Sequence, residues 1–372
     1  MEREELGAWL RLLLTPGVGN GTARRLLAAF GPPAQVFRQG RDALGVVVEP
    51  RLVDALLHLP PDFDAQLDTT WSWLQGASDR HLLVLGDPAY PADCLQMEDP
   101  PILLFAQGPL TALAYPRRVA VVGSRNPSPQ GLLNARLFAR SLGQAGVCVV
   151  SGLALGVDGA AHEGALAAGA PTIAVVGTGL DRVYPARHKD LAHRIAAAGL
   201  LLSEYPLGTP PLAPNFPKRN RLIAALGQGT LVVEAALQSG SLITARLAVE
   251  MGREVFAIPG SIHAPQSRGC HALIRQGAKL VESAQDVLED LRWPSQAVVP
   301  AVAPPPHDAA DGPRSPHAAL LAALGHDPVS LDALQARTGL ATAALQAALL
   351  ELELEGLVGR LPGGLFQRSG QA

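Results

Sequence analysis

The feature that most constrains the fold is a regular alternation of short apolar runs and helical segments in the middle of the chain. Continuous Val, Ile and Leu runs predict strands buried on both faces, and the intervening helices predict parallel pairing through right-handed crossovers. We therefore predict an α/β fold with an extended Rossmann-like, doubly wound and mostly parallel sheet, whose ligands bind outside the carboxyl ends of the strands. The predicted strands are RVAVVG (118–123), VCVVSG (147–152), TIAVVG (172–177), LLLSEY (200–205), TLVVEA (230–235), EVFAIPG (254–260) and AKLVES (278–283).

Other regions flank this sheet. Two further apolar runs, 82–86 and 102–106, are predicted to be strands that lead into it. A Pro- and Ala-rich stretch without apolar periodicity predicts a linker. We accordingly divide the chain into an N-terminal helical domain (1–78), a Rossmann-like domain (79–293), a linker (294–316) and a C-terminal module (317–372).

The N-terminal region begins with a helical hairpin. Residues 4–30 read as two helices joined by the turn TPGVGNG (15–21), which resembles a helix-hairpin-helix/SAM-like unit. A Gly-x-Gly turn that opens a helix exposes backbone N–H groups, which can bind a phosphate. A packing hairpin without a ligand explains the same pattern equally well.

The C-terminal module is predicted to contain three helices followed by a strand pair, which resembles a winged helix. Its third helix (341–355) carries Glu351, Glu353 and Glu355 and neither Lys nor Arg. A helix that reads duplex DNA needs cations for the phosphates. We therefore expect this module to contact protein.

Charge is distributed unevenly. The net charge is −3, yet residues 115–230 hold 12 Lys and Arg against 5 Asp and Glu. This indicates a local polyanion site, although solvated helix faces would give the same balance. Three scattered cysteines suit a reducing cytoplasm, and no apolar run approaches the 18 residues of a membrane span. We expect a cytoplasmic protein without a membrane partner.

The first two predicted strands end in small residues and donors. Gly123-Ser124-Arg125 follows the first strand, where a glycine permits close approach of a phosphate and an arginine supplies a planar fork of donors. Gly152 ends the second strand. Asp158 and His162 follow it on one helix, and we favour a structural role for them over a catalytic one because no nucleophile accompanies them.

The densest cation cluster follows the fourth strand. A helix beginning at Pro217 would direct its first N–H groups to the same anion that the cations meet. Phe216 either stacks on an unpaired base or fills the core. The run FPKRNR supplies the candidates Phe216, Lys218, Arg219, Asn220 and Arg221. After the fifth strand, Ser239-Gly240-Ser241 forms a predicted anion nest at a helix start.

Taken in order, these elements resemble the DprA/Smf family of DNA-processing proteins over residues 80–290. The resemblance rests on GSR (123–125), SGLALGVDGAAH (151–162), GTGLDRVYP (177–185), FPKRNR (216–221), SGSLITA (239–245), GREVFAIPG (252–260) and GA (277–278). Two positions depart from the family pattern: His188 and the pair Cys270-His271 stand where asparagines are usual.

The resemblance implies a single-stranded DNA-binding protein of natural transformation that protects incoming strands, helps to load RecA on them and acts as a dimer. It implies phosphate-backbone contacts from Arg125, Lys218, Arg219 and Arg221, and a pocket lined by Gly123, Ser124, Gly240 and Ser241.

The main alternative is an enzyme. Gly227-Gln228-Gly229-Thr230 with Glu234 faintly resembles the site of lysine-decarboxylase-like phosphoribohydrolases, although the paired glycines and a second carboxylate are missing. The sequence contains no phosphate-binding P-loop, no complete GxGxxG and no zinc-ligand spacing. We therefore predict no catalytic residue, cofactor or metal.

Overall fold

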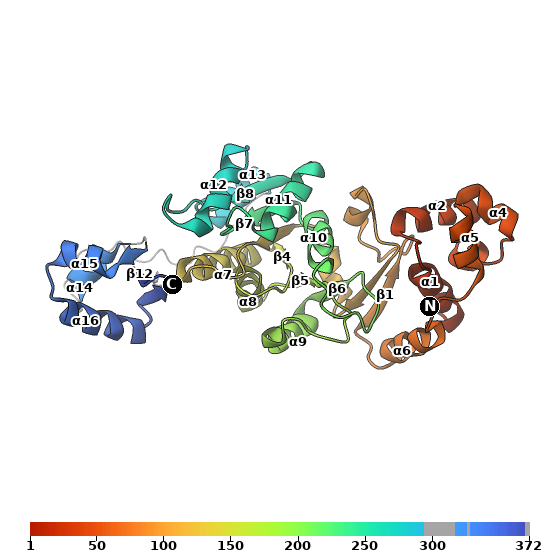
Figure 1. Cartoon of the computed structure of the whole chain (residues 1–372), viewed down its shortest axis with the longest axis horizontal. Helices are drawn as coiled ribbons and strands as arrows, with labels where there is room; N and C mark the ends of the chain where they lie inside the picture. Colours follow the sequence, from red (N-terminus) through yellow and green to blue (C-terminus); the bar gives the residue numbers. More distant parts are fainter. Residues whose placement is uncertain (294–316, 326–327, 369–372) are drawn as a thin grey trace.

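The computed structural model describes residues 1–293, 317–325 and 328–368, so the predicted linker at 294–316 lies outside the described residues. Figure 1 shows the central sheet between the N-terminal helices at one end and the small C-terminal unit at the other.

The central sheet has nine strands in the order β1-β2-β6-β5-β4-β3-β7-β8-β9. The seven strands from β6 to β9 in that order pair in parallel, while β1 and β2 form an antiparallel edge. The Rossmann-like, mostly parallel α/β fold predicted from the sequence is therefore confirmed. The strands are β1 (Arg80–Val84), β2 (Leu103–Gln107), β3 (Arg118–Val122), β4 (Cys148–Ser151), β5 (Thr172–Val175), β6 (Leu200–Ser203), β7 (Gly229–Val232), β8 (Glu254–Ala257) and β9 (Lys279–Leu280).

Both faces of the sheet are buried. On β3, Val119 and Val121 enter one core, while Ala120 and Val122 enter the other. Side chains alternate along a strand, so an unbroken apolar run fills both cores at once. The first core is closed by α7 (Pro129–Gln144), α8 (Val157–Ala167) and α13 (Ala284–Asp290), and the second by α10 (Asn215–Leu226), α11 (Gly240–Glu250) and α12 (Arg268–Arg275).

The order of the strands reverses at β3. The chain proceeds from β3 through β4 and β5 to β6 on one side, and then returns to place β7 on the other side of β3. Loops that leave two neighbouring strands in opposite directions open a crevice at their carboxyl ends. The switch point between β3 and β7 is therefore where the fold offers a ligand site.

The N-terminal helices share a hydrophobic core with the sheet edge. Leu10 and Leu26 belong to the same buried cluster as Phe105 on β2 and Ile195 on α9 (Lys189–Ala198). The helices are α1 (Arg3–Leu14), α2 (Asn20–Phe30), α3 (Pro33–Val36), α4 (Arg41–Val47), α5 (Pro50–Leu57) and α6 (Phe63–Gln75).

The predicted hairpin docks on the sheet domain. Asn20 Nδ2 donates to Asp99 Oδ2 over 3.2 Å, and Arg24 Nη2 lies 3.5 Å from Asp99 Oδ1. Arg24 also donates to the Glu98 carbonyl oxygen over 3.0 Å. A carboxylate of this chain thus meets the side chains that begin α2, which supports the packing interpretation of the hairpin.

The C-terminal unit contains the three predicted helices and a strand pair, together with a short third strand that the sequence did not indicate. His317 Nε2 lies 2.7 Å from Glu351 Oε2, so one of the three glutamates noted in the sequence makes a contact within the unit. Its elements are α14 (Ala318–Leu324), β10 (Val329–Ser330), α15 (Leu331–Thr338), α16 (Thr342–Leu354), β11 (Val358–Leu361) and β12 (Leu365–Arg368).

All three cysteines, Cys94, Cys148 and Cys270, are free thiols inside the core, and burial raises the pKa of each to about 12.

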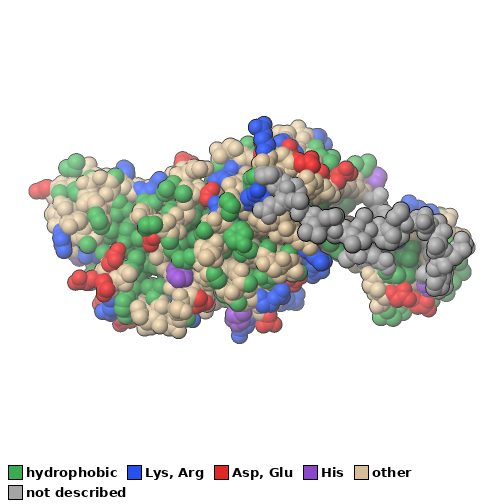
Figure 2. Space-filling model, turned by 180° about the vertical axis from the view of Figure 1, so that it is seen from behind, with side chains coloured by type: hydrophobic (Ala, Val, Ile, Leu, Met, Phe, Trp, Pro, Cys, Tyr) green, Lys and Arg blue, Asp and Glu red, His purple; other side chains and the backbone are tan. Residues whose placement is uncertain are grey.

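Seen from behind, the surface mixes charged and hydrophobic side chains, and Lys, Arg and His gather at its lower edge, where Figure 1 places α9 (Figure 2). Within the described ranges, no helix is long and apolar enough to cross a membrane.

Candidate functional site

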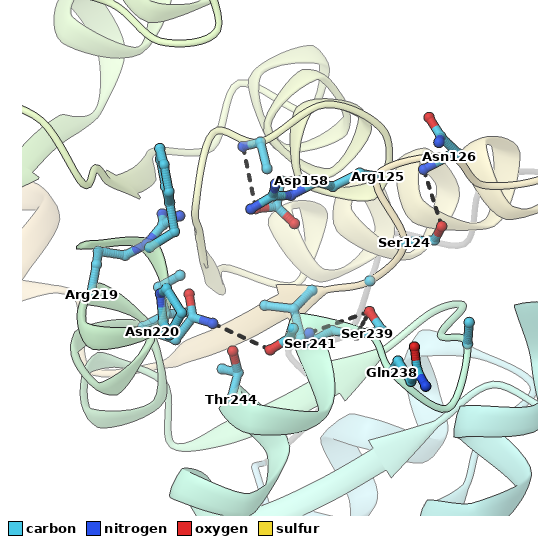
Figure 3. Close-up of a pocket in the computed structure, with 18 residues that line it drawn as sticks. Ser124, Arg125, Asn126, Asp158, Arg219, Asn220, Gln238, Ser239, Ser241 and Thr244 are labelled. Atoms are coloured by element: carbon cyan, nitrogen blue, oxygen red, sulfur yellow. Dashed lines mark hydrogen bonds between the residues drawn. The ribbon is translucent and has the colours of Figure 1, made fainter. Parts of the chain in front are cut away.

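A pocket of about 470 Å³ lies at the switch point between β3 and β7. We call it the switch-point pocket. Its walls come from the turn after β3, the start of α10 and the segment that leads into α11 (Figure 3). Nine of the twelve predicted site residues line it: Gly123, Ser124, Arg125, Phe216, Arg219, Asn220, Ser239, Gly240 and Ser241.

The turn after β3 is held rigidly by the end of β7. The Ser124 N–H donates to the Glu234 carbonyl oxygen over 2.6 Å, and Ser124 Oγ accepts from the Asn126 N–H over 3.1 Å. A Cβ at Gly123 would lie 2.9 Å from that Glu234 carbonyl oxygen, so only glycine fits. The turn leaves the Arg125 side chain exposed at the mouth of the pocket.

Arg125 and Phe216 meet across the pocket. The Arg125 guanidinium carbon lies 5.6 Å from the centre of the Phe216 ring, within cation–π range. Phe216 is half-buried, and a Cβ at Gly177 would lie 3.1 Å from its ring, so the ring packs closely on the end of β5. Phe216 is therefore neither fully buried in the core nor fully exposed, and part of its ring lines the pocket.

Helix α10 begins at Asn215, two residues before the predicted start at Pro217. Asn215 Nδ2 donates to the Gly177 carbonyl oxygen over 3.1 Å, and the Asn215 carbonyl oxygen accepts from the Tyr205 hydroxyl over 3.2 Å. These contacts fix the helix start in place, with Lys218 exposed in its first turn. Lys218 Nζ lies 5.9 Å from the Tyr205 ring centre, just outside the set of pocket-lining residues.

Arg219 forms the floor of the pocket. Its side chain is buried, and Nη1 donates to the carbonyl oxygens of Gly152, over 2.6 Å, and Val175. Burial lowers the pKa of Arg219 to about 10, while the nearby Asp158 carboxylate opposes that shift. The guanidinium therefore ties the ends of β4 and β5 together beneath the pocket.

Asp158 completes this floor. Its Oδ2 accepts from the N–H groups of Gly152 and Ala154 over 3.1 and 3.3 Å. Burial raises the pKa of Asp158, and the Arg219 charge and these hydrogen bonds oppose the rise. The contacts that Asp158 makes with these backbone N–H groups are structural, which is the role that the sequence favoured for this residue.

Gly152 and Arg219 were both predicted from the sequence as DNA-binding residues; Arg219 lines the pocket, whereas Gly152 does not. A Cβ at Gly152 would overlap the Arg219 guanidinium and lie 2.7 Å from Asp158 Oδ2. Gly152 is buried and outside the pocket lining. The packing of the floor requires a glycine at position 152, and Arg219, which was predicted to bind phosphate, uses its Nη1 to donate to two carbonyl oxygens.

Arg221 also differs from the expected phosphate contact. Its Nη2 forms an ion pair with Glu204, a residue only 6% exposed, and Nη1 donates to the Asp99 carbonyl oxygen over 2.7 Å. Burial raises the pKa of Glu204, and the Arg221 charge opposes the rise. Arg221 therefore anchors α10 to the loop that also docks the N-terminal hairpin.

The Ser239-Gly240-Ser241 segment caps α11 at the edge of the pocket. Ser239 Oγ lies 2.7 Å from Ser241 Oγ and accepts from the Ser241 N–H over 3.4 Å. Asn220 Nδ2 donates to the Gly240 carbonyl oxygen over 3.2 Å, which links α10 to α11 across the crevice. A Cβ at Gly240 would meet nothing within 4 Å, so this side of the pocket is open.

Sequence reasoning missed several polar residues of the pocket. Asn126, Gln238 and Thr244 line it beside the predicted motifs. Asn126 and Gln238 are exposed, so each can offer an amide to a ligand. Each lies within three residues of a predicted site residue, and extending the motifs along their loops would have found them.

Glu234, the carboxylate of the enzyme alternative, is occupied. Its Oε2 accepts from the Ser128 N–H over 2.9 Å, and its Oε1 accepts from the Ser128 hydroxyl. Burial raises the pKa of Glu234, and the two Ser128 hydrogen bonds oppose the rise. Glu234 is also absent from the pocket lining, where Asp158 is the one carboxylate among the described residues.

The two departures from the family pattern both make structural contacts. His188 Nδ1 lies 2.9 Å from the Leu153 carbonyl oxygen, and His271 Nε2 lies 2.9 Å from the Gly260 carbonyl oxygen. Cys270 is fully buried beneath β7. Among the residues that the structure describes, no three His, Cys, Asp or Glu side chains gather as metal ligands.

Comparison with known proteins agrees with this architecture. The family model for DNA recombination-mediator protein A matches residues 81–292, more than half of the chain. The chain belongs to the DprA/Smf family. A second model, for the DprA winged helix domain, matches residues 303–364, which confirms the winged-helix character of the C-terminal module.

Individual relatives extend the match. Protein Smf of Escherichia coli is 43% identical over 304 residues, which cover 80% of each chain. DNA processing protein DprA of Streptococcus pneumoniae is 51% identical over 207 residues, covering 56% of this chain and 73% of that protein.

Two solved structures resemble this DprA/Smf chain. The crystal structure of DprA from S. pneumoniae superposes with a TM-score of 0.67 at 40% identity, covering 76% of this chain and 97% of that one. DNA processing protein A from Helicobacter pylori, described with a single-stranded DNA binding mode, gives a TM-score of 0.52 at 33% identity, covering 57% of this chain and 96% of that one.

Proposed function

We propose that this DprA/Smf protein binds single-stranded DNA in the switch-point pocket and does no chemistry on it. The observation that carries the proposal is the contact between the exposed Arg125 guanidinium and the half-buried Phe216 ring at the pocket mouth. A cation beside an aromatic ring suits a phosphate next to an unpaired base. The H. pylori relative, described as binding single-stranded DNA, supports the choice of ligand.

The residues divide into two groups under this proposal. Arg125 and Lys218 contact phosphates because their side chains are exposed, and Phe216 stacks on a base. Backbone, hydroxyl and amide groups that line the pocket add hydrogen bonds. We assign that role to Gly123, Ser124, Asn220, Ser239, Gly240 and Ser241.

The enzyme alternative has little support from the geometry. A phosphoribohydrolase needs a carboxylate beside the sugar, whereas Glu234 is hydrogen-bonded to Ser128 outside the pocket lining. Asp158 reaches the pocket but accepts two backbone N–H groups beside Arg219. We therefore propose that the protein acts by binding alone.

The test is a titration of labelled oligo(dT), and of a duplex of equal length, across a series of salt concentrations. We expect wild type to prefer the single strand and to lose affinity as salt rises. The Arg125→Ala/Lys218→Ala double variant should bind far more weakly and with a shallower salt dependence. Equal affinity for duplex and single strand, or release of base from a nucleoside monophosphate, would contradict the proposal.

Two partners complete the proposal: RecA, to which the protein delivers the bound strand, and a second copy of the chain. For the dimer we propose the surface of α12 and the edge strand β9, where Leu280 is 50% exposed. Light scattering of wild type and Leu280→Glu tests the dimer, and RecA filament formation on coated single strands tests the delivery. We place this activity in the cytoplasm, where three free thiols are expected to persist.

A further inference from the structure

Tyr184 lies beside the switch-point pocket, in the loop between β5 and α9, and sequence reasoning gave it no role. Its ring centre lies 5.5 Å from that of Phe216, with the two planes tilted by 38°. Phe216 in turn carries Arg125 at 5.6 Å. Three segments of the chain therefore supply one continuous surface of flat groups, which we call the stacking surface: Arg125, Phe216 and Tyr184.

Tyr184 differs from Tyr90 and Tyr205, both of which have a clear structural role. Tyr90 and Tyr205 are buried, and their hydroxyls donate to the carbonyl oxygens of Pro101 and Asn215. Tyr184 is 48% exposed, and its hydroxyl has no hydrogen-bond partner within the described part of the chain. What Tyr184 offers is its ring, half in contact with Phe216 and half open to solvent.

We propose that Tyr184 is a second base-stacking position, which holds the base next to the one on Phe216 and leads the strand out of the pocket on the β5–α9 side. This inference rests on the proposed single-stranded DNA binding. Base–aromatic stacking tolerates any sequence because every base has a flat face. Two adjoining rings hold consecutive bases, while Arg125 meets the phosphates or stacks through its guanidinium plane.

The experiment measures oligo(dT) affinity for wild type, Tyr184→Ala, Tyr184→Leu and Tyr184→Phe at several salt concentrations. We expect the Ala and Leu variants to bind about tenfold more weakly, because both lose the ring, and the Phe variant to stay within about twofold of wild type. The salt dependence should not change, since no phosphate contact is removed. Leu212→Ala, at a 50% exposed apolar side chain outside the stacking surface, is the matched control and should bind like wild type.

A second arm separates stacking from a role in holding the loop. Oligonucleotides with a single abasic site at successive positions are titrated against wild type and Tyr184→Ala. At one position the missing base should weaken wild type but not the variant, because the two changes remove the same contact. If the Ala variant loses affinity equally for every abasic position, or binds like wild type, the stacking role is wrong. If wild type itself fails to bind oligo(dT), the proposed single-stranded DNA binding is wrong. That result differs from the two outcomes that would contradict only the stacking role of Tyr184.

Discussion

The exposed rim of the switch-point pocket, with Arg125 and Lys218 beside it, and the buried floor draw on neighbouring residues that differ in burial and in hydrogen-bond partners. Lys218 is exposed, while Arg219, the next residue on α10, is buried and donates to two carbonyl oxygens beneath the pocket. Arg221 turns to a third direction and pairs with Glu204. A run of cations in the sequence is thus divided among one exposed side chain and two that make structural contacts, because successive residues of a helix point about 100° apart.

Arg219→Met should break the floor and give the largest effect. The substitution removes the hydrogen bonds that the buried guanidinium donates to the Gly152 and Val175 carbonyl oxygens, so the free energy of unfolding should fall by about 3 kcal/mol. Urea denaturation followed by circular dichroism measures it. Lys218→Met is the matched control, and a surface change of this kind should stay within about 0.5 kcal/mol of wild type. Similar losses in both variants would abolish the distinction between rim and floor.

Two glycines of the predicted site allow a second comparison. At Gly152→Ala the new methyl group would overlap the Arg219 guanidinium, so we expect a loss of about 1–3 kcal/mol in unfolding free energy. At Gly240→Ala the Cβ meets nothing within 4 Å, and stability should hardly change. Thermal unfolding of the two variants side by side measures the difference. A destabilised Gly240→Ala together with an unchanged Gly152→Ala would reverse our assignment of the two positions.

His162, which lies on α8 together with Asp158, should make the stability of the protein depend on pH. Thr172 Oγ1 donates to the Val149 carbonyl oxygen and so accepts from His162 Nδ1 over 2.7 Å. The opposite nitrogen, Nε2, is buried without a hydrogen-bond partner in the described residues, and burial lowers the pKa of His162 to about 3.

The folded protein therefore keeps this histidine neutral, while the unfolded chain takes up a proton below about pH 6.5. Its contribution to stability is present above that pH and falls by about 1 kcal/mol per pH unit between pH 6 and 4. His162→Asn should remove this slope. Asp158 and Glu204, whose pKa values are raised by burial, change the stability with pH in the opposite sense. The quantity to compare is therefore the difference in unfolding free energy between His162→Asn and wild type, measured by denaturant titration at each pH. Parallel curves would exclude a neutral buried His162.

Arg125→Lys should give the smallest effect and examines the rim alone. Lysine keeps the charge but lacks the planar guanidinium that lies over Phe216. We expect oligo(dT) affinity to fall about threefold with the salt dependence unchanged, whereas Arg125→Ala should also reduce the slope by about 0.7 for one lost phosphate contact. Fluorescence anisotropy of labelled oligo(dT) at four salt concentrations measures the affinity and the salt dependence of both variants. An Arg125→Lys protein that binds oligo(dT) as tightly as wild type would show that the ring contact has no part in binding.

The sequence predicted the fold well because the information is local. The unbroken runs at 118–122 and 148–151 are strands, and the turn that follows the first of them, 123–125, lies in the switch-point pocket as expected. The extra strand β10 was missed because two residues carry no periodicity. The winged-helix resemblance of the C-terminal module was nevertheless sound, since its helices and final hairpin have clear patterns.

The division of roles within the site could not be predicted. Whether Arg221 binds phosphate depends on Glu204 and on the Asp99 carbonyl oxygen, which is 122 residues away in sequence. The role of Gly152 likewise depends on a guanidinium 67 residues further on. Such contacts arise only when distant segments pack, so residue types and spacing identify the neighbourhood of the site but not the direction of each side chain.

The buried thiols have a practical consequence. Because Cys94, Cys148 and Cys270 all lie in the core with pKa values near 12, the folded protein should not react with maleimides. A single cysteine placed on the surface then becomes the sole attachment point for a dye, with no native residue replaced. Pairs of such dyes, one on the protein and one on an oligonucleotide, would trace the path of a strand across the molecule by energy transfer.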